Sequence, residues 1–499
     1  MNVVIGFGAL ALFFAVMIGS LYMVGGKDKD FNDYAVGGRS FGSWYQTMSF
    51  LNTWYPGTVF IAWAGMAATA GAIGFYALTY SLLIVVVMYL ISRRVWLWGA
   101  NFNLQTQSDL IGMRFNSRAV RIIAAVIGIV TQFPFIVLGM QALGMVFYYA
   151  SYGHLSFRQA VVLGIAVLVI RQYWTVKMGM RGVVITDFVQ GLVAYVIGSI
   201  LLLGLIIWLV RHGHGFGDVP PTLWTLPGLG SATGPLYLFS LVFTGAIGGF
   251  AWPGMFARLF TANGVRTLKN SAGLGVPLSF IFFSLLVIFA ILASTLTGVS
   301  KNPDHVFFMT TDMFGPWLVA LAGVVVFAAN VGSVDGLLQA NGAQLAKDVV
   351  GDFVDLSDRG KVITAKIGIV AITVAAGAVA SLNLTGLITL AIVSYQGIVQ
   401  LAVPLFLGIF WRRGNKFGAV AGMLVGVGTA AVLQVLYPVS VLWLGGLTSG
   451  VAGMAVNLVI YVACAYLIPV SGAEKERVNH MFTTTPAASG GVPVTAGQG

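Results

Sequence analysis

Apolar residues along this chain collect in long runs, and short stretches of charged, Gly and Pro residues separate the runs. A helix needs about 20 apolar residues to cross the roughly 30 Å of hydrocarbon in a bilayer, and most runs reach that length. We therefore predict an all-α polytopic membrane protein with about thirteen transmembrane helices. The predicted ranges are 3–24, 44–70, 73–98, 119–150, 157–176, 182–210, 235–261, 272–298, 315–347, 362–382, 385–411, 417–437 and 443–469.

The composition supports this interpretation. Of the 499 residues, 58% are hydrophobic and 8% are charged, whereas about a quarter of the residues in an ordinary soluble domain are charged. The first apolar run has no basic segment before it and no small-residue cleavage site after it, so we expect a retained helix rather than a signal peptide. The expected location is a cell membrane, most simply the inner membrane of a bacterium.

Basic residues gather in alternate loops of this topology. The formal net charge is +11, which we attribute to the positive-inside rule rather than to a nucleic-acid partner. The N-terminus is then predicted outside and the C-terminus inside, where residues 473–499, rich in Thr, Pro, Ala and Gly, are predicted to form a disordered tail. Residues assigned to the inside are Lys27, Lys29, Arg39, Arg93, Arg94, Arg114, Arg118, Arg121, Lys177, Arg181, Arg258, Arg266, Lys269, Lys347, Arg359, Lys361, Arg412, Arg413, Lys416, Lys475 and Arg477.

Few residues suit enzyme or metal-centre chemistry. Cys464 is the single cysteine, and none of the five histidines stands at metal-ligand spacing from a Cys or a carboxylate. The stretches between the predicted spans are also too short for a soluble domain. We expect no enzyme activity, no cofactor, no nucleic acid and no obligate protein partner. The expected partners are a small-molecule solute and the lipid bilayer.

Two predicted spans contain a Pro-Gly pair where a helix should be continuous: "NTWYPGTVF" begins at Asn52, and "FAWPGMFAR" begins at Phe250. These spans are five helices apart and so run in opposite directions, as in an inverted repeat. Broken helices free backbone groups that bind ions and solutes near the middle of the membrane. Two unrelated proline kinks are the alternative. The candidate solute-binding residues at the breaks are Thr53, Trp54, Pro56, Gly57, Thr58, Trp252, Pro253 and Gly254.

Two carboxylates stand inside predicted spans, where charge is costly and usually functional. Asp335 lies in "NVGSVDGLLQANG", and Asp187 lies in "GMRGVVITDFVQG". Both are candidates for an ion pathway or a proton carrier. The alternatives are a structural hydrogen-bonding acid for Asp335, and a snorkelling or Arg181-paired interfacial carboxylate for Asp187.

Four stretches in this order resemble the sodium:solute symporter family: "DYAVGGRSFGSW" (33–44), "GMRGVVITDFVQG" (179–191), "GSVDGLL" (332–338) and "GIFWRRGNKFGAVAGMLVG" (408–426). The resemblance covers nearly the whole chain and implies a LeuT-like fold of five plus five helices. The first repeat is then about 44–210 and the second about 235–411, within a membrane domain of residues 1–472. Segments 3–24, 417–437 and 443–469 become accessory helices.

The resemblance implies sodium as the coupling ion. Carried over by position, its ligands are backbone carbonyls of Asn52, Tyr55 and Ala329 and the hydroxyl of Ser333. Many family members carry a second hydroxyl beside it, where this chain has Gly332. The ligand set is completed by a carbonyl, a water or Asp335, or the coupling ion is a proton carried by Asp335. Asp187 matches the family's acid on the inner ion pathway.

The residues around the two breaks are small or aromatic, whereas the family's sugar carriers place polar side chains there. "WPGMFAR" and "FPFIVLGMQALG" (133–144) are similar to the family's monocarboxylate-permease branch, which adds Gln141 to the solute-binding candidates. A short organic anion fits physically, because half-helix N-termini bind a carboxylate. Symport of an amino acid, vitamin or sugar stays an alternative. A membrane solute sensor is the alternative from another class of protein.

Overall fold

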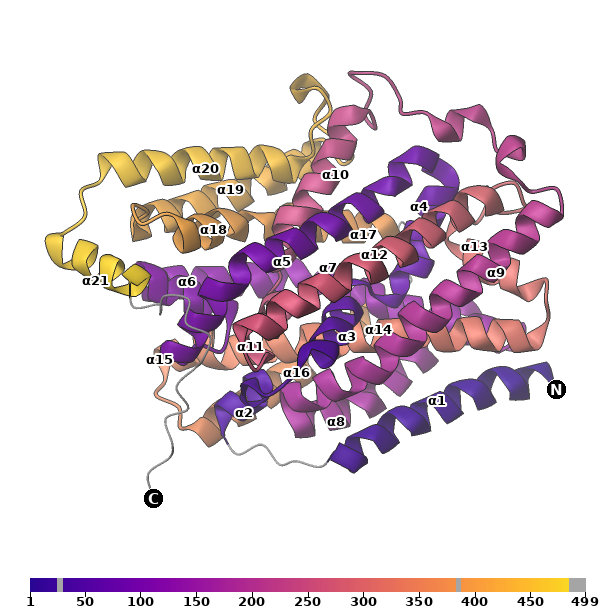
Figure 1. The fold of residues 1–499 in the computed structure, drawn as a ribbon, viewed down its shortest axis with the longest axis horizontal. Helices are drawn as coiled ribbons and strands as arrows, with labels where there is room; N and C mark the ends of the chain where they lie inside the picture. Colours follow the sequence, from indigo (N-terminus) through magenta and orange to yellow (C-terminus); the bar gives the residue numbers. More distant parts are fainter. Residues whose placement is uncertain (25–29, 383–386, 484–499) are drawn as a thin grey trace.

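The computed structural model describes residues 1–24, 30–382 and 387–483. Figure 1 shows long helices that run side by side, with α1 along one edge and α19 and α20 along the opposite edge. The helices are α1 (Asn2–Val24), α2 (Phe31–Val36), α3 (Ser43–Trp54), α4 (Ala62–Ala70), α5 (Tyr76–Asn101), α6 (Gln107–Phe115), α7 (Arg118–Ala150), α8 (Phe157–Gly191), α9 (Gly198–Arg211), α10 (Pro235–Gly248), α11 (Pro253–Thr261), α12 (Val265–Ala293), α13 (Val306–Asp312), α14 (Pro316–Gln344), α15 (Gly351–Phe353), α16 (Asp358–Ala380), α17 (Leu387–Ile398), α18 (Ala402–Phe410), α19 (Lys416–Leu436), α20 (Ser449–Leu467) and α21 (Gly472–Thr483).

Among the described residues, ten helices are long and apolar enough to cross a membrane, or up to eleven if the bent pair α10 and α11 is one span. The all-helical membrane architecture is therefore confirmed. Two of these helical runs, Gly57–Asn101 and Phe157–Arg211, have 45 and 55 residues. At about 1.5 Å per residue, each is far longer than one crossing needs. The count of thirteen and the orientation stay predictions.

Glycines in the left-handed region bend both long runs. Gly71 (φ +55°) turns between α4 and α5, and an added Cβ there would lie 1.9 Å from the carbonyl oxygen of Leu223. Gly179 (φ +58°) breaks α8, and its added Cβ would lie 2.6 Å from the carbonyl oxygen of Tyr34. A side chain would be strained at both positions and would also collide with backbone. These turns coincide with the predicted divisions between spans.

Both Pro-Gly pairs interrupt their helices as predicted. α3 ends at Trp54, Pro56 is extended (ψ 165°), and a short 3-10 turn, Gly57–Phe60, precedes α4. In the second break, the helical segment Pro235–Ala251 and α11 meet at Trp252 with a bend of 51°. Proline has no N–H for an i to i−4 bond, so each break is fixed in the covalent chain.

α14 forms the centre of the bundle. Every residue from Val325 to Gln344 is buried, because α14 packs against α1, α3, α7, α8, α11 and α16. Any polar residue in this stretch must find its partner on a neighbouring helix. The candidate residues Ala329, Ser333 and Asp335 all lie here.

The prediction of a disordered tail is wrong for its first part. Residues up to Thr483 belong to α21, which buries Val478, Met481 and Phe482. The indole N–H of Trp98 donates to the carbonyl of Met481 (3.2 Å) and attaches this helix to α5. These three apolar side chains, in one short amphipathic stretch, pack α21 against the rest of the bundle. Residues 484–499 of the predicted tail lie outside the described residues.

Candidate functional site

The two breaks meet at a cluster of aromatic rings. The ring centroids of Trp54 and Trp252 are 6.1 Å apart. Tyr395 of α17 stands 6.1 Å from Trp54 and 5.4 Å from Trp252, and Phe135 of α7 stands 4.8 Å from Trp252. Tyr80 of α5 completes the cluster at 5.9 Å from Trp54. The cluster joins the two breaks, and its rings favour edge-on contacts. Sequence reasoning found the two tryptophans but not Phe135, Tyr80 or Tyr395.

Buried hydrogen-bonding groups accompany these rings. Within the described chain, the indole N–H groups of Trp54 and Trp252 and both polar atoms of the Gln132 amide have no hydrogen-bond partner. Gln132 lies between Gly128 and Phe135 on α7, about one helical turn from each. Phe135 contacts Trp252, and a Cβ added to Gly128 would lie 2.8 Å from Pro253. These residues share one face of α7. Buried polar groups are normally satisfied, so these groups mark a place for a polar ligand.

The start of α11 adds backbone donors at this place. Pro253 is the first residue of α11 and the helix has nine residues, so the N–H groups of its first turn have no acceptor inside the helix. Together with the positive end of the helix dipole, they favour a negatively charged group.

Gln141 lies elsewhere. It is nine residues after Gln132, which is about two and a half turns, so the two side chains lie on opposite faces of α7. Its amide donates to the carbonyl of Ala380 in α16 (3.4 Å). Gln132 is thus the glutamine of α7 that faces the second break.

The first break contacts α14 at Ser333, one of the predicted cation ligands. The hydroxyl of Ser333 donates to the carbonyl of Thr53 (3.2 Å). The amide of Asn52 donates to Asp187 Oδ1 and to Gln190 Oε1, both at 3.0 Å. A Cβ added to Gly332 would lie 1.7 Å from Asn52 Nδ2. A side chain at position 332 would therefore require the Asn52 and Gln190 side chains to move.

Other predicted residues of the first break have structural contacts. The carbonyl of Tyr55 accepts a hydrogen bond from the hydroxyl of Tyr195. A Cβ added to Gly57 would lie 2.3 Å from the carbonyl oxygen of Val326, so this glycine lets the break approach α14 closely. The buried hydroxyl of Thr58 has no hydrogen-bond partner among the described residues.

Asp187 is fully buried beside the first break. Its Oδ2 accepts from Ser49 (2.6 Å) and from Nη2 of Arg258 (3.1 Å). Arg258 also donates to the hydroxyl of Thr53 (3.0 Å). The Arg181 pairing considered for Asp187 is wrong, because Arg181 pairs with Asp33 at 2.6 Å. Arg258, assigned to a basic loop, is instead a buried residue of α11.

Asp335 is also paired. Arg171 Nη2 lies 2.9 Å from its Oδ2, and both side chains are buried. The amide of Gln172 donates to its Oδ1 at 2.6 Å. Sequence reasoning missed Arg171 and Gln172. The available signal was an arginine inside an apolar run, which needs a partner in the membrane just as a carboxylate does.

The donor set fits an alkali cation better than a transition metal. Among the described residues, no group of three or more His, Cys, Asp or Glu side chains could hold a metal ion. The first break and α14 instead meet through the carbonyl oxygen of Thr53 and the hydroxyl of Ser333, and the carbonyl of Tyr55 next to them in the break accepts from Tyr195. Such oxygens are ligands for a hard monovalent cation.

Comparison with known proteins finds relatives that align with most of the chain. A monocarboxylate transport permease protein of Rhizobium johnstonii is 24% identical over 459 residues, covering 88% of this chain and 91% of that protein. An osmoregulated proline transporter of Bacillus subtilis is 24% identical over 469 residues, covering 85% and 87%.

A solved structure of a Na+-coupled sialic acid symporter in a substrate-bound, outward-open state has the same fold. Its TM-score is 0.75 at 19% identity, with 94% of this chain and 98% of that chain covered. These similar proteins are membrane transporters and not enzymes, as expected for this chain. The model of the sodium:solute symporter family matches residues 34–426. The chain therefore belongs to the sodium:solute symporter family.

Proposed function

We propose that this protein is a sodium-coupled symporter of a short organic anion such as a monocarboxylate, acting in a cell membrane. The observation that carries the proposal is the group of unpartnered donors where the two breaks meet, on Trp54 of the first break, Trp252 of the second and Gln132 of α7. The start of α11 adds positive partial charge. Aromatic rings around these donors suit a small apolar body. A carboxylate would satisfy the donors, and the rings would cover the rest of the solute.

Sodium is proposed as the coupling ion because the buried carboxylates already have partners. To carry a proton, Asp335 would have to give up its 2.9 Å ion pair with Arg171. That change would leave a buried guanidinium without a counter-charge, which is strongly unfavourable. Sodium instead needs neutral oxygens, which the carbonyls of Asn52, Tyr55 and Ala329 and the hydroxyl of Ser333 supply.

The proposed cycle uses the contact between the first break and α14. Sodium draws the carbonyls of the broken span toward Ser333, and the second break, on the same aromatic cluster, then closes around the anion. The repeats rock to the other side of the membrane with both ligands bound. A ligand can shift such an equilibrium only through its different affinities for the two states. Symport therefore requires that sodium and the anion each bind more tightly to the closed arrangement. It also requires that both ligands are needed to form that arrangement.

Uptake into proteoliposomes tests this assignment. An inward sodium gradient is expected to drive uptake of lactate, pyruvate or acetate, and a proton gradient alone is not. Gln132→Leu is expected to raise the KM of the anion about tenfold, since it removes a donor to a charged group. Gln141→Leu, on the opposite face of the same helix, is the matched control. Uptake that ignores the sodium gradient would exclude sodium coupling.

An amino acid is the second candidate, because the aromatic cluster also suits a cationic ammonium group and the chain is similar to a proline transporter. Competition separates the two solutes. Excess proline is expected to leave lactate uptake unchanged if the solute is a simple anion. If proline competes and is itself accumulated, the amino acid replaces the anion.

A further inference from the structure

A cavity of about 520 Å³ lies where the chain leaves α20 and enters α21. Three of its lining residues are basic and exposed: Arg412 and Arg413 from the turn before α19, and Lys475 from α21. Gly414 seats this turn against α20, since its added Cβ would lie 1.8 Å from the hydroxyl oxygen of Tyr461. The two arginines are therefore held in place by packing of the backbone.

The one acidic residue that lines the cavity does not neutralise these cations. Both carboxylate oxygens of Glu474 accept from Arg477, at 2.6 Å each. Arg477 also donates to the carbonyls of Met113 (3.1 Å) and Arg114 (2.8 Å) at the end of α6. Among the described residues, Arg412, Arg413 and Lys475 have no carboxylate within 4.0 Å. The cavity thus keeps an excess of positive charge.

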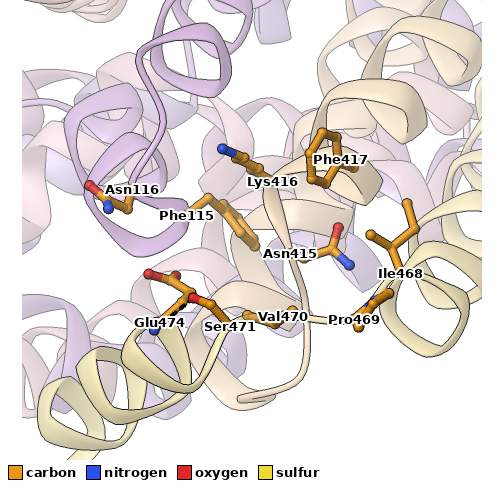
Figure 2. A pocket seen from close by; sticks show the side chains of 10 residues that line it. All are labelled: Phe115, Asn116, Asn415, Lys416, Phe417, Ile468, Pro469, Val470, Ser471 and Glu474. Atoms are coloured by element: carbon orange, nitrogen blue, oxygen red, sulfur yellow. Dashed lines mark hydrogen bonds between the residues drawn. The ribbon is translucent and has the colours of Figure 1, made fainter.

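Figure 2 shows a smaller cavity at the same link. Ile468, Pro469, Val470 and Glu474 line both cavities. The smaller cavity adds Lys416 across from Glu474. The link between α20 and α21 therefore lines two cavities that both have basic side chains in their walls.

Apolar side chains of α20 continue from the cavity along the outer edge of the bundle. Tyr466 is 59% exposed and Leu467 is 80% exposed, and α20 lies at the edge of the fold in Figure 1. The guanidinium of Arg413 stands 4.1 Å from the ring centre of Tyr466. A tyrosine beside an arginine at the end of a membrane helix is typical of the boundary between lipid tails and headgroups.

We propose that this cavity binds the headgroup of an anionic phospholipid whose acyl chains lie along α20. The three cations supply the charge complementarity, and the exposed apolar residues connect the cavity directly with the bilayer. Basic pockets at the ends of membrane helices attract anionic lipids in this way. Because α21 supplies Lys475 and contacts α5 and α6, the lipid is expected to stabilise the docked position of α21. The proposal does not depend on the identity of the transported solute.

Thermal unfolding of the full chain in detergent tests the proposal. Added phosphatidylglycerol is expected to raise the Tm more than phosphatidylcholine with the same acyl chains, and added salt is expected to reduce the difference. Arg412→Gln, Arg413→Gln and Lys475→Gln together are expected to remove most of the difference. The matched control replaces Arg266 and Lys269 at the start of α12 and Arg359 at the start of α16 by Gln. It removes the same charge away from the cavity and is expected to keep the response.

Several outcomes would overturn the proposal. They are equal responses to the two lipids, an unchanged response of the triple variant, or the same Tm rise from inorganic phosphate or from poly-glutamate. A Tm rise from inorganic phosphate would indicate a soluble anion. A Tm rise from poly-glutamate would indicate an acidic protein partner. If the triple variant does not fold, Lys475→Gln alone is measured by native mass spectrometry, where it is expected to retain fewer bound phosphatidylglycerol molecules than the wild type. Unchanged retention would reject the site.

Discussion

At the scale of single residues, Ser333 is the side chain best placed to link a cation to the broken helix. Its hydroxyl lies 3.2 Å from the carbonyl of Thr53. Replacing Ser333 by Ala removes one oxygen ligand while leaving the helix intact, so the sodium concentration for half-maximal uptake is expected to rise about tenfold. Uptake measured against sodium concentration checks this. Thr373→Ala, which removes a hydroxyl bonded to Ile369 within α16, is expected to leave the sodium response unchanged.

Asp187 and Arg258 form a pair whose members depend on each other. Arg258→Met leaves a buried carboxylate without its cation, and such a loss costs about 3–5 kcal/mol of stability. The double variant Asp187→Asn with Arg258→Met removes both charges and is expected to recover much of the loss. Thermal unfolding of the wild type, of Asp187→Asn and Arg258→Met alone, and of the double variant gives a double-mutant cycle. Losses that simply add in the double variant would show that the two residues act independently.

Asp304 gives a pH-dependent prediction outside the membrane-spanning segments. It lies in the turn before α13, where burial raises the pKa of its carboxyl to about 6. A raised pKa means that the folded state favours the protonated carboxyl. The stability of the fold therefore falls as the pH rises from the ordinary pKa of 3.8 to about 6. Asp304→Asn stays neutral and is expected to raise the Tm more at pH 8 than at pH 5, and not at pH 3. A gain of equal size at both pH values would contradict this account.

At the scale of elements, the close contact between the first break and α14 depends on Gly57. An added Cβ at this position would lie 2.3 Å from backbone of α14, and backbone cannot move aside as a side chain can. Gly57→Ala is therefore expected to lower the Tm and to abolish most uptake. Gly204→Ala in α9 meets no atom within 4 Å, so it is the matched control. Normal uptake by Gly57→Ala would mean that the break stands farther from α14 in the transporting protein.

The local sequence determines some helices of the fold more fully than others. Apolar runs predicted the spans because hydrocarbon thickness sets helix length, and the paired Pro-Gly breaks followed from the chemistry of proline. The helix α21 was missed, since its polar composition hides three apolar residues that dock on α5 and its neighbours. Docking of that kind depends on a surface built by distant parts of the chain.

At the scale of the whole molecule, the missed residues of the site share one physical reason. Arg171 and Asp335 are 164 positions apart, and Arg258 and Asp187 are 71 apart. Sequence identified the carboxylates because charge in an apolar run is costly, but it gave no rule for choosing their partners. Tyr395 was likewise missed. It reaches the aromatic cluster only because α17 packs against α7 and α10.

These pairs also lead to a prediction about the transport cycle. In these two ion pairs, two buried aspartates and two buried arginines sum to zero charge, so the pairs by themselves add no net charge to the core. One sodium bound with one monoanion keeps that sum at zero and avoids the desolvation cost of a net buried charge.

Transport is therefore expected to be electroneutral. The measurement is sodium-driven lactate uptake into proteoliposomes with and without an inside-negative potassium diffusion potential. Each translocated net charge would gain about 2.3 kcal/mol from 100 mV, which corresponds to a roughly fiftyfold larger accumulation. The potential is expected to change accumulation by less than twofold. A large increase would show that more than one cation accompanies each anion.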